Sequence, residues 1–534
     1  MPLAKERRLN PRQLAADVVK KLHLPSWVQN VEIAGAGFLN FRIKTAILRD
    51  CLNAATGSPH PFLAPVEKPQ TMVIDFSSPN VAKPMHVGHI RSTILGDCLA
   101  RIGRLLGHRV ITDNHIGDWG TQFGKLLLGW KHSLDSAALQ RDPLDQMERI
   151  YRETHAACEN DAATLEKARQ ELVKLQNGDS ENLELWRQMI SLSQAQFTAI
   201  YRRLGVQFDH TLGESFYNPR LKSIVQELQD LGVACESEGA MAVFFDEIPE
   251  LKAHPALIQK SDGASNYMTT DLATLQYRVE TWNPHEIIYV TDGRQQLHFK
   301  QLFAAFRRWR PDLPLRLAHV WFGAILGEDG KPFKTRTGDT VKLTDLLDEA
   351  EERAFRVVSE KNPDLNEPRR REIARIVGIG AIKYADLLPN RQSDYTFSWD
   401  KMLALHGNTA PYLLYAYARI RSIFRKHGAG AEPNSPPNTP LTAEDLSSEE
   451  ETALVKHLLN FGLVIEAVAD EYRPNYLCNY LYELAGNFTR FYENCPVLKA
   501  DEPQKQTRLL ICDLTSKILK QGLNLLGIET AEHM

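Results

Sequence analysis

The sequence predicts an α/β protein in which a parallel-sheet domain carries a helical insertion, follows a short α/β segment and precedes an all-helical C-terminal domain. The sheet is predicted because short β-like runs (TMVIDF, HRVIT, EIIYVT, LAHVWFGAIL) alternate with helical runs from Thr71 to about Asn390. The insertion is predicted because the chain from about Trp130 to Asp230 is charged and helix-periodic. After Phe397, strand signals largely give way to helical runs such as TRLLICDLTSKILKQGLNLLG.

These patterns divide the chain into three segments. The first, 1–66, pairs a helical pattern (PRQLAADVVKKLHL) with an alternating run (FLNFRI) and ends in a proline-bearing linker. The second, 67–396, is the sheet domain, with its helical insertion at about 130–235. The third, 397–534, is helical apart from HGAGAEPNSPPNTPLTAED, which is predicted to be a flexible loop.

Composition and charge exclude several function classes. With 43% hydrophobic and 24% charged residues, no apolar run of membrane-spanning length and no secretory signal, the sequence predicts a cytoplasmic protein without a membrane role. A net charge of -4 argues against a strongly basic nucleic-acid coat, so nucleic-acid contacts must come from local patches. The seven cysteines are scattered without a C-x-x-C pair or a Cys/His cluster, which predicts reduced, mostly buried thiols and no metal site.

A phosphate-binding turn is predicted between the first strand of the sheet domain and the next helix. The strand TMVIDF leads through a loop to an apolar-periodic helix, with His86 and His89 at or near its N-terminus. Free backbone N–H groups and the helix dipole favour a polyphosphate there, and Gly88 lets a flat ligand approach the backbone. Two imidazoles can donate hydrogen bonds to a phosphoryl group as charge develops. An isolated H-x-G-H leaves equal room for histidines that only cap an ordinary helix.

The motif extends well beyond four letters. The run SSPNVAKPMHVGHIRST resembles the HIGH signature of class I aminoacyl-tRNA synthetases, in the form characteristic of arginyl-tRNA synthetases, and the resemblance continues through NHIGDWGTQFG, GNTAPYLLYAYARIRSIF and LNLLGIETAEHM. It implies a Rossmann-like catalytic domain and a helical anticodon-binding domain. It also implies a monomer in which L-arginine and ATP, with Mg²⁺ on the phosphates, form arginyl-adenylate and pyrophosphate once tRNA is bound. Arginine then passes to the terminal adenosine of tRNA(Arg).

A guanidinium substrate needs planar, charged acceptors, so carboxylates are expected in its pocket. Tyr267 and Asp271 are four residues apart, so one helical turn can bring them to one face. From the residues alone, Asp271 is more simply a first-turn acid, Tyr267 a core residue and Gln295 a loop or helix-start residue. The resemblance instead implies an arginine pocket of Asp75, Ser78, Asn80, His89, Tyr267, Asp271 and Gln295.

The second signature of class I enzymes is a lysine-rich loop that holds the β and γ phosphates of ATP. Here LGEDGKPFKTRTGDTVKL stands in its place, and the match is degenerate, since such a cluster is by itself more often a solvated turn. Lys83, just before the histidines, is hypothesised to supply part of the missing charge. The resemblance implies an ATP site of Pro79, Asn80, His86, Gly88, His89, Lys331 and Lys334, with His86, His89, Lys83 and Lys334 catalytic.

Contacts with tRNA are expected from both ends of the chain. Tyr412, Tyr415 and Arg419 share one predicted helix, and aromatic stacking with arginine contacts commonly reads single-stranded loops. Without the resemblance, tyrosines that pack the helix core and an arginine that faces water are the simpler interpretation. The first segment begins partway through the appendage with which bacterial-type arginyl enzymes contact the tRNA elbow, so either this appendage is reduced or the start of the chain is misassigned.

Two other functions fit parts of the sequence. A small-molecule nucleotidyltransferase also uses H-x-G-H after a strand, but it does not explain the helical C-terminal domain. A non-catalytic tRNA-binding relative would fit the degenerate second loop, but it has no reason to retain the histidine pair, Asp75 and Asp271.

Overall fold

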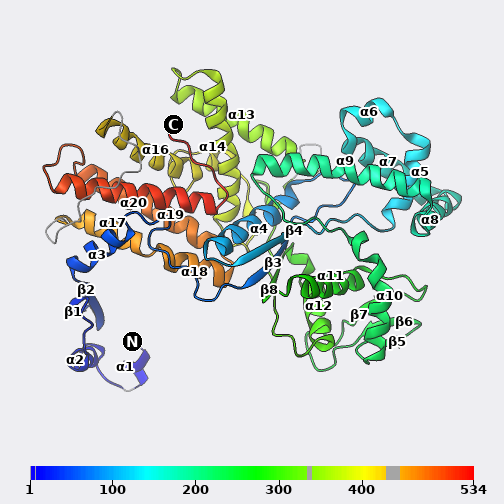
Figure 1. The fold of residues 1–534 in the computed structure, drawn as a ribbon, viewed down its shortest axis with the longest axis horizontal. Helices are drawn as coiled ribbons and strands as arrows, with labels where there is room; N and C mark the ends of the chain where they lie inside the picture. The colour runs from blue at the N-terminus through cyan, green and yellow to red at the C-terminus, as the bar shows by residue number, and fades with distance from the viewer. Residues whose placement is uncertain (1, 7, 334–339, 429–445) are drawn as a thin grey trace.

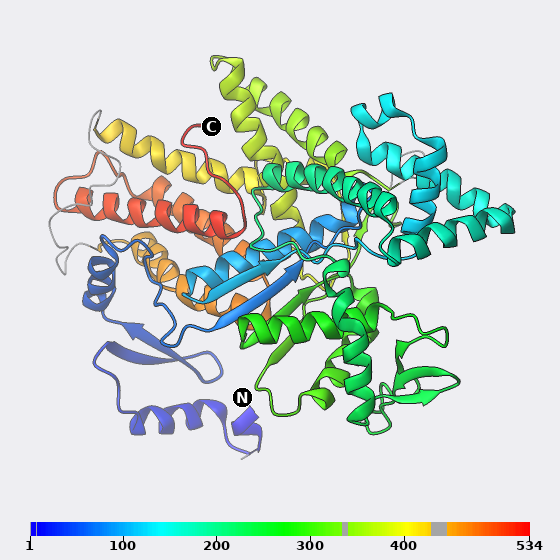
Figure 2. The same cartoon turned by 45° about the vertical axis from the view of Figure 1, so that its right-hand side comes forward.

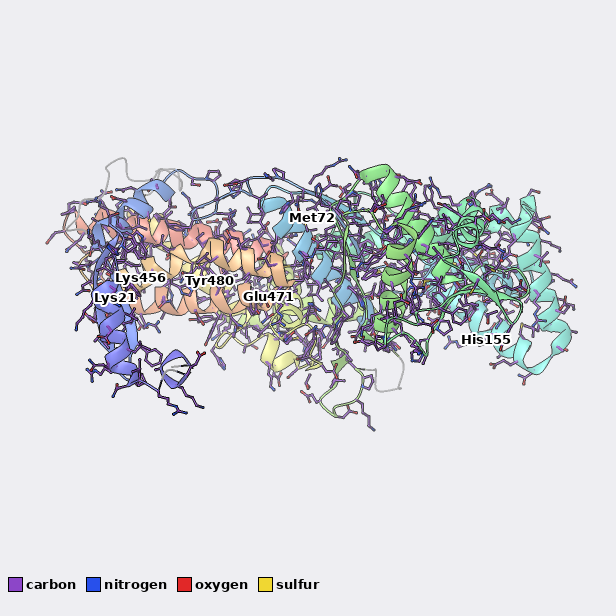
Figure 3. All side chains as sticks on the ribbon, turned by 90° about the horizontal axis from the view of Figure 1, so that it is seen from below. Lys21, Met72, His155, Lys456, Glu471 and Tyr480 are labelled. Atoms are coloured by element: carbon purple, nitrogen blue, oxygen red, sulfur yellow. The ribbon has the colours of Figure 1, made fainter. Side chains whose placement is uncertain are left out.

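The computed structural model describes residues 2–6, 8–333, 340–428 and 446–534. Lys334, and all but the first two residues of the predicted loop 427–445, lie outside the described residues. The chain forms an elongated molecule with the sheet domain at its centre (Figure 1). Figure 3 shows Lys21 of the N-terminal segment and His155 of the insertion at opposite ends, with Met72 of the sheet between them.

The centre of the fold is a four-stranded parallel sheet in the order β4-β3-β8-β9. This confirms the predicted α/β class. The chain runs from β3 to β4 on one side and later returns to the other side of β3 as β8, so the carboxyl ends of β3 and β8 meet at the kind of switch point where parallel sheets bind ligands. The strands are β3 (Thr71–Phe76), β4 (Arg109–Asp113), β8 (Glu286–Val290) and β9 (Arg316–His319).

The sheet separates two hydrophobic cores, because successive side chains of a strand point to opposite faces. Val73 packs with α11 (Tyr267–Trp282) and α12 (Gln296–Trp309). Its neighbour Ile74 packs on the other face with α4 (Val87–Leu105), the helix predicted to follow the phosphate-binding turn. Both faces of β3 are therefore apolar, as is usual for a strand in the middle of a parallel sheet.

After β4 the chain forms a series of helices, which project from the sheet domain (Figure 2). A small antiparallel sheet, in the order β5-β6-β7, follows them. It was not predicted, because strands of three or four residues are too short to give a periodic signal. The elements are α5 (Gln122–Ser133), α6 (Ser136–Arg141), α7 (Pro143–Asn160), α8 (Ala162–Gln176), α9 (Ser180–Leu204), α10 (Glu214–Asp230), β5 (Cys235–Ser237), β6 (Ala240–Val243) and β7 (Ala256–Gln259).

The C-terminal part is helical, as predicted, and its helices pack beside α4 (Figure 1). Two short strands, β10 and β11, pair in parallel where this part joins the sheet domain. The elements are β10 (Ile325–Leu326), α13 (Leu343–Lys361), α14 (Glu367–Leu387), β11 (Tyr395–Thr396), α15 (Trp399–Met402), α16 (Ala410–His427), α17 (Glu449–Leu459), α18 (Phe461–Glu471), α19 (Asn475–Asn494) and α20 (Gln504–Leu525).

One segment of this part, Glu449–Glu471, is apolar and long enough to cross a membrane by length and composition alone. In the fold it forms two helices, α17 and α18, that meet at Asn460. Leu454 and Ile465 from these helices are fully buried in the protein core. Burial of such residues against neighbouring helices accounts for part of the apolar composition of this segment.

The N-terminal segment is a pair of helices, an antiparallel hairpin and a further helix, and it projects beyond the helical part (Figure 1). Asn10 caps α2 by accepting from Arg12 N at 2.9 Å. The predicted helix and the run FLNFRI were found, whereas β1, the hairpin partner of that run, was missed. The elements are α1 (Pro2–Glu6), α2 (Pro11–Lys21), β1 (Val28–Ala34), β2 (Phe38–Ile43) and α3 (Thr45–Ala55).

A buried ion pair joins the sheet domain to the helical part. Arg91 of α4 is 1% exposed, and its Nε lies 3.1 Å from Asp386 of α14. Its Nη1 also donates to Gly323 O at 2.8 Å and Ser393 O at 3.2 Å. Breaking such a pair leaves a charge without a partner, so Arg91 fixes the position of α4. The seven cysteines are free, and five of them are buried, which confirms the predicted mostly buried thiols.

Candidate active site

The two signature histidines form a capping box at the start of α4. His86 is the N-cap, and its Nδ1 accepts from the Gly88 backbone N–H at 3.0 Å. The His86 backbone N–H in turn donates to Nδ1 of His89 at 3.1 Å, and the two rings lie 4.0 Å apart. The capping interpretation of these histidines is therefore correct, but capping occupies only one nitrogen of each ring.

Burial keeps both imidazoles neutral. It lowers the pKa of His89 to about 3, with a smaller contribution from His86. Burial also lowers the pKa of His86, and the positive charges of Lys83 and Arg294 add to the effect. A neutral imidazole whose Nδ1 accepts a hydrogen bond carries its proton on Nε2. The cap thus leaves two Nε2–H donors available to a phosphoryl oxygen.

Gly88 is needed for this ring geometry as well as for ligand approach. A Cβ at position 88 would lie 2.8 Å from Cε1 and 2.9 Å from Nδ1 of His86. These contacts are shorter than carbon atoms tolerate, so a side chain would push the His86 ring out of the cap.

The loop between β3 and α4 has a strained backbone. Ser77 and Ser78 have φ of 74° and 47°, values that residues other than glycine adopt rarely. The Ser78 N–H donates to Asn114 Oδ1 at 3.0 Å, and its hydroxyl donates to Asp75 Oδ1 at 3.1 Å. The loop is thus held in one conformation by hydrogen bonds from its neighbours.

Pro79 and Asn80 continue the loop beside the segment after β4. Pro79 is buried and its carbonyl accepts from Gly117 N at 3.1 Å, while Val81 N donates to Gly117 O at 3.0 Å. Asn80 is exposed, and its Oδ1 would lie 2.3 Å from a Cβ at position 117. The absence of a side chain at Gly117 therefore leaves space for the Asn80 amide.

Asp75 lies one residue before the end of β3, close to the expected place, but its carboxylate faces inward. It is 4% exposed, and Arg278 Nη2 lies 2.6 Å from Asp75 Oδ2 and 2.8 Å from Asp113 Oδ2. Arg278 is itself fully buried. Sequence analysis missed Arg278, since nothing in the pattern of α11 marks one arginine of a helix as buried. Asp75 thus has an internal guanidinium partner and reaches the loop through Ser78.

Tyr267 and Asp271 lie on one face of α11, as their spacing predicted. Asp271 is hydrogen-bonded to His298 Nε2 at 2.6 Å, and the Tyr267 ring lies 5.1 Å from the His298 ring at 65°. Tyr267 is 67% exposed and α11 has no acid in its first turn, so the core and first-turn interpretations are wrong. His298 was not predicted.

Glu214, the first residue of α10, is a second acid at this place that sequence analysis missed. Burial raises its pKa to about 7, and the negative charges of Asp271 and Asp118 raise it further, while His115 acts in the opposite sense. Two carboxylates from different helices therefore interact across one space. From the sequence alone, Glu214 cannot be distinguished from an ordinary acid in the first turn of a helix.

Gln295 lies at the carboxyl end of β8, beside β3. It ends the short 3-10 turn Gly293–Gln295 and is exposed. Arg294 in the same turn is held by Asp292, with Nε 2.8 Å from Oδ1, and its positive charge reaches His86. The switch point of the sheet thus supplies Gln295 and Arg294 to the same region as the histidines.

The second loop begins and ends beside the described part of the site. Leu326 and Pro332 form an isolated bridge, and Lys331 lies exposed in the turn between them. After the part of the loop that is not described, the chain returns to the signature: Val87 N donates to Val341 O at 3.0 Å, and Leu343 N donates to Met85 O at 2.9 Å.

Lys83 is exposed, and its Nζ lies 5.2 Å from the centre of the Tyr151 ring of α7. Its charge reaches His86, whose pKa it lowers. Among the residues that the structure describes, no three His, Cys, Asp or Glu side chains are arranged to hold a metal ion.

A separate aromatic surface lies on the helical part, where α16 meets α19. The Arg419 guanidinium lies 4.9 Å from the centre of the Tyr415 ring and 5.8 Å from that of Tyr492. Tyr412 lies 5.6 Å from Tyr482. Tyr415, Tyr482 and Tyr492 are 36 to 44% exposed, so the interpretation of these tyrosines as core residues is wrong for Tyr415.

Comparison with known proteins places this arrangement in a family. A family model for tRNA synthetases class I (R), catalytic domain, matches residues 62–399, more than half of the chain. The chain belongs to the arginyl-tRNA synthetase family. Models for the DALR anticodon binding domain and the arginyl tRNA synthetase N terminal domain match residues 413–534 and 1–43.

Relatives in the arginyl-tRNA synthetase family match along the whole chain. Arginine--tRNA ligase from Klebsiella pneumoniae (strain 342) is 46% identical over 543 residues, covering 100% of this chain and 92% of that protein. The crystal structure of arginyl-tRNA synthetase from Plasmodium falciparum has a TM-score of 0.82 at 29% identity, covering 99% of this chain and 90% of that one. Thermus thermophilus arginyl-tRNA synthetase has the same TM-score at 27% identity, covering 100% and 93%.

The chain is therefore an arginine–tRNA ligase: it activates L-arginine with ATP, releases pyrophosphate, and transfers arginine to tRNA(Arg). This confirms the predicted enzyme class, with ATP as a substrate. Residues 413–534 of the helical part match the family's anticodon-binding domain. The nucleotidyltransferase and non-catalytic alternatives are set aside, since the family match covers the catalytic and anticodon-binding domains together.

Proposed function

We propose that the arginine side chain binds between the carboxylates of Glu214 and Asp271. The observation that carries this proposal is the approach of two acids from different helices: half-buried Glu214 begins α10, Asp271 lies on α11, and the negative charge of Asp271 helps to raise the pKa of Glu214. A guanidinium is the substrate group that offsets two such charges, and it can bond both carboxylates in its own plane. His298 holds Asp271 in place, and the exposed Tyr267 ring covers the same space.

The α-ammonium and carboxylate groups of arginine bind at the carboxyl ends of β3 and β8. Ser78, Asn80 and Gln295 supply hydroxyl and amide groups there, suited to an ammonium and a carboxylate. Asp75 acts behind them, because it accepts from the Ser78 hydroxyl and is closed off by Arg278. His89 lies at the junction of the arginine and ATP positions.

ATP binds against the start of α4, with Pro79, Asn80 and Gly88 beside it. The arginine carboxylate attacks the α phosphorus, and the bond to pyrophosphate breaks as the new bond forms. The Nε2–H groups of His86 and His89 donate to phosphoryl oxygens as charge develops. Lys83, Lys331 and Lys334 hold the β and γ phosphates. When bound to the phosphates, Mg²⁺ neutralises part of their charge.

The aromatic surface of the helical domain, with Tyr412, Tyr415 and Arg419, stacks on unpaired anticodon bases. Arg419 lies close enough to the Tyr415 ring for a cation–π contact that keeps both groups at the surface. The N-terminal segment contacts another part of the tRNA. We place the domain boundaries after residues 66 and 396, with the insertion at about 130–235.

We propose that the enzyme acts as a monomer in the cytoplasm without a membrane role. The apolar segment Glu449–Glu471 supports this, because it is divided into two helices with buried core residues. Sedimentation of the purified chain tests the monomer.

ATP–pyrophosphate exchange with each amino acid, with and without tRNA(Arg), tests the proposed site. The expected result is exchange with arginine in the presence of tRNA, and a rise in the KM for arginine of at least about tenfold for Asp271→Asn, the loss of one charged hydrogen bond. An unchanged KM in this variant would contradict the arginine pocket proposed here.

A further inference from the structure

Helix α9 of the insertion reaches the active-site loops through side chains on one of its faces. Trp186, Ser193 and Tyr201 are spaced by two helical turns, so they point the same way. Trp186 Nε1 donates to Asp118 O at 2.9 Å, and Ser193 Oγ accepts from Ala82 N at 3.0 Å. The Tyr201 hydroxyl lies 2.7 Å from Ser77 Oγ.

Two of these contacts, those of Ser193 and Tyr201, fall on the strained part of the signature loop. Ser77 and Ala82 have φ of 74° and 62°, and Ser78 has 47°. Left-handed backbone at residues other than glycine persists only where the surroundings hold it. Ser193 and Tyr201 form hydrogen bonds directly with Ala82 and Ser77. Ser78 is connected to Tyr201 indirectly, through one further residue.

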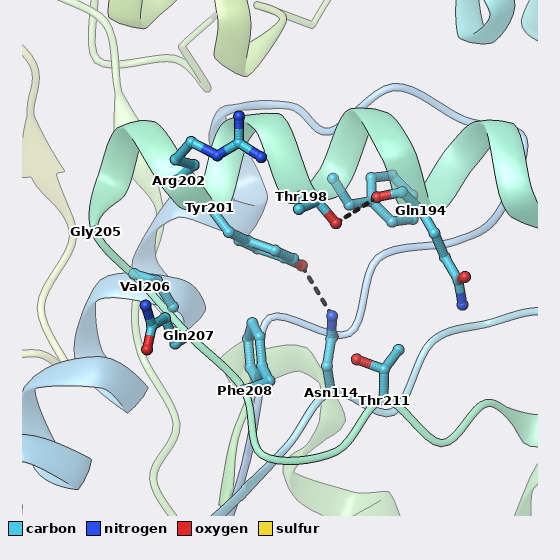
Figure 4. A pocket seen from close by; sticks show the side chains of 11 residues that line it. Asn114, Gln194, Thr198, Tyr201, Arg202, Gly205, Val206, Gln207, Phe208 and Thr211 are labelled. Carbon is cyan, nitrogen blue, oxygen red and sulfur yellow. Dashed lines mark hydrogen bonds between the residues drawn. The ribbon is translucent and has the colours of Figure 1, made fainter.

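That further residue is Asn114. Its Nδ2 donates to the Tyr201 hydroxyl at 3.1 Å, as Figure 4 shows, and its Oδ1 accepts from Ser78 N at 3.0 Å. The Tyr201 hydroxyl therefore accepts from Asn114 and donates to Ser77 Oγ. Both hydrogen bonds hold the backbone from which Ser78 and Asn80 face the substrate.

The same network continues to the signature histidines. Thr93 Oγ1 lies 2.9 Å from Ser77 Oγ and 2.8 Å from His89 O. The Ser77 backbone N–H also donates to Ser92 Oγ at 2.8 Å. Ser77 thus joins Tyr201 of the insertion to the first turns of α4.

Tyr201 borders a cavity on its other side. A cavity of about 530 Å³ lies between α9 and the segment 205–211, lined by Thr198, Tyr201, Phe208 and their neighbours (Figure 4). The Tyr201 ring packs on Phe208 with centroids 5.0 Å apart, whereas its hydroxyl faces Ser77 and Asn114.

We propose that Tyr201 is a positioning residue of the arginine and ATP site, through which the helical insertion sets the conformation of the strained 77–82 loop. This inference rests on the proposed placement of arginine against Ser78 and Asn80. Tyr201 acts through Ser77 and Asn114 and does not itself contact substrate.

The experiment compares Tyr201→Phe with Thr198→Val in tRNA-dependent ATP–pyrophosphate exchange. Thr198 lines the same cavity on the same helix, but its hydroxyl donates to Gln194 O of its own helix at 2.7 Å, so this variant is a matched control. Tyr201→Phe is expected to raise the KM for arginine at least about tenfold, the effect of a lost buried hydrogen bond, and Thr198→Val to leave it unchanged. If Tyr201 had only a structural role, the variant would contain less folded enzyme. A smaller folded fraction lowers the apparent kcat and leaves the KM unchanged, so a raised KM indicates a positioning role.

Ser77→Ala removes the same hydrogen bond from the loop side, without altering α9. If the proposal holds, Ser77→Ala also raises the KM for arginine, and the double variant with Tyr201→Phe raises it by less than the two single effects combined, because both variants remove the Tyr201–Ser77 hydrogen bond. Fully additive effects, or a normal arginine KM in Tyr201→Phe, would overturn it. A normal KM here with a raised KM in Asp271→Asn would leave the proposed arginine pocket intact, so the two failures are distinguishable.

Discussion

Arginine binding should strengthen as pH rises through neutrality, because of Glu214. Its pKa is raised to about 7, chiefly by burial and then by Asp271, so it is protonated below that pH and ionised above it. If only the ionised form pairs with the guanidinium, the ionised fraction rises from about one in ten at pH 6 to about nine in ten at pH 8. The affinity for arginine should therefore increase about tenfold over this interval.

Titration calorimetry of the free enzyme with L-arginine measures this effect without ATP or tRNA. Near pH 7, binding should release about half a proton per site, visible as a dependence of the heat on the buffer. Glu214→Gln should flatten the pH dependence and weaken binding about ten- to a hundredfold at pH 8, as expected for one charge-assisted hydrogen bond. Glu227→Gln is the matched control, because Glu227 is a half-buried acid on the same helix that pairs with Arg310 at 2.9 Å.

Other ionisable groups face the same space, namely His115, His298, Asp118 and Asp271. Their contribution remains in Glu214→Gln, so the difference between the two proteins belongs to Glu214. The reasoning is refuted if wild type binds arginine equally at both pH values, or if Glu214→Gln keeps the wild-type slope.

Three further predictions concern the signature and its support. Gly88→Ala should lower kcat for pyrophosphate exchange at least about tenfold by displacing the His86 ring, with little change in arginine affinity; retained kcat would contradict the cap geometry. Arg278→Met should destabilise the protein by about 3–5 kcal/mol, since it leaves Asp75 and its partner acid buried without a cation, and thermal unfolding measures this. Lys83→Ala should reduce turnover in adenylate formation far more than arginine binding, and unchanged exchange would exclude its role.

Much of the fold follows from local patterns. The central strands β3 and β8 are largely apolar runs typical of a buried parallel sheet, and α4 has apolar residues at helical spacing after a clear turn. β1 and the small sheet β5-β6-β7 were missed, because short or half-exposed strands owe their form to their partners.

The sequence by itself determined the fold class, the strand-loop-helix unit that carries the two histidines, and the placement of Tyr267 and Asp271 on one helix face, because these depend on period and spacing along the chain. Only the tertiary structure decided which charges meet. Asp75 turned out to face Arg278, 203 residues away, and Glu214 faces Asp271 from another helix. The same holds for the bond from Tyr201 to Ser77. These contacts, and the pKa shifts of the groups that make them, depend on burial and on the approach of elements distant in sequence. Neither can be read from the residues of a single segment.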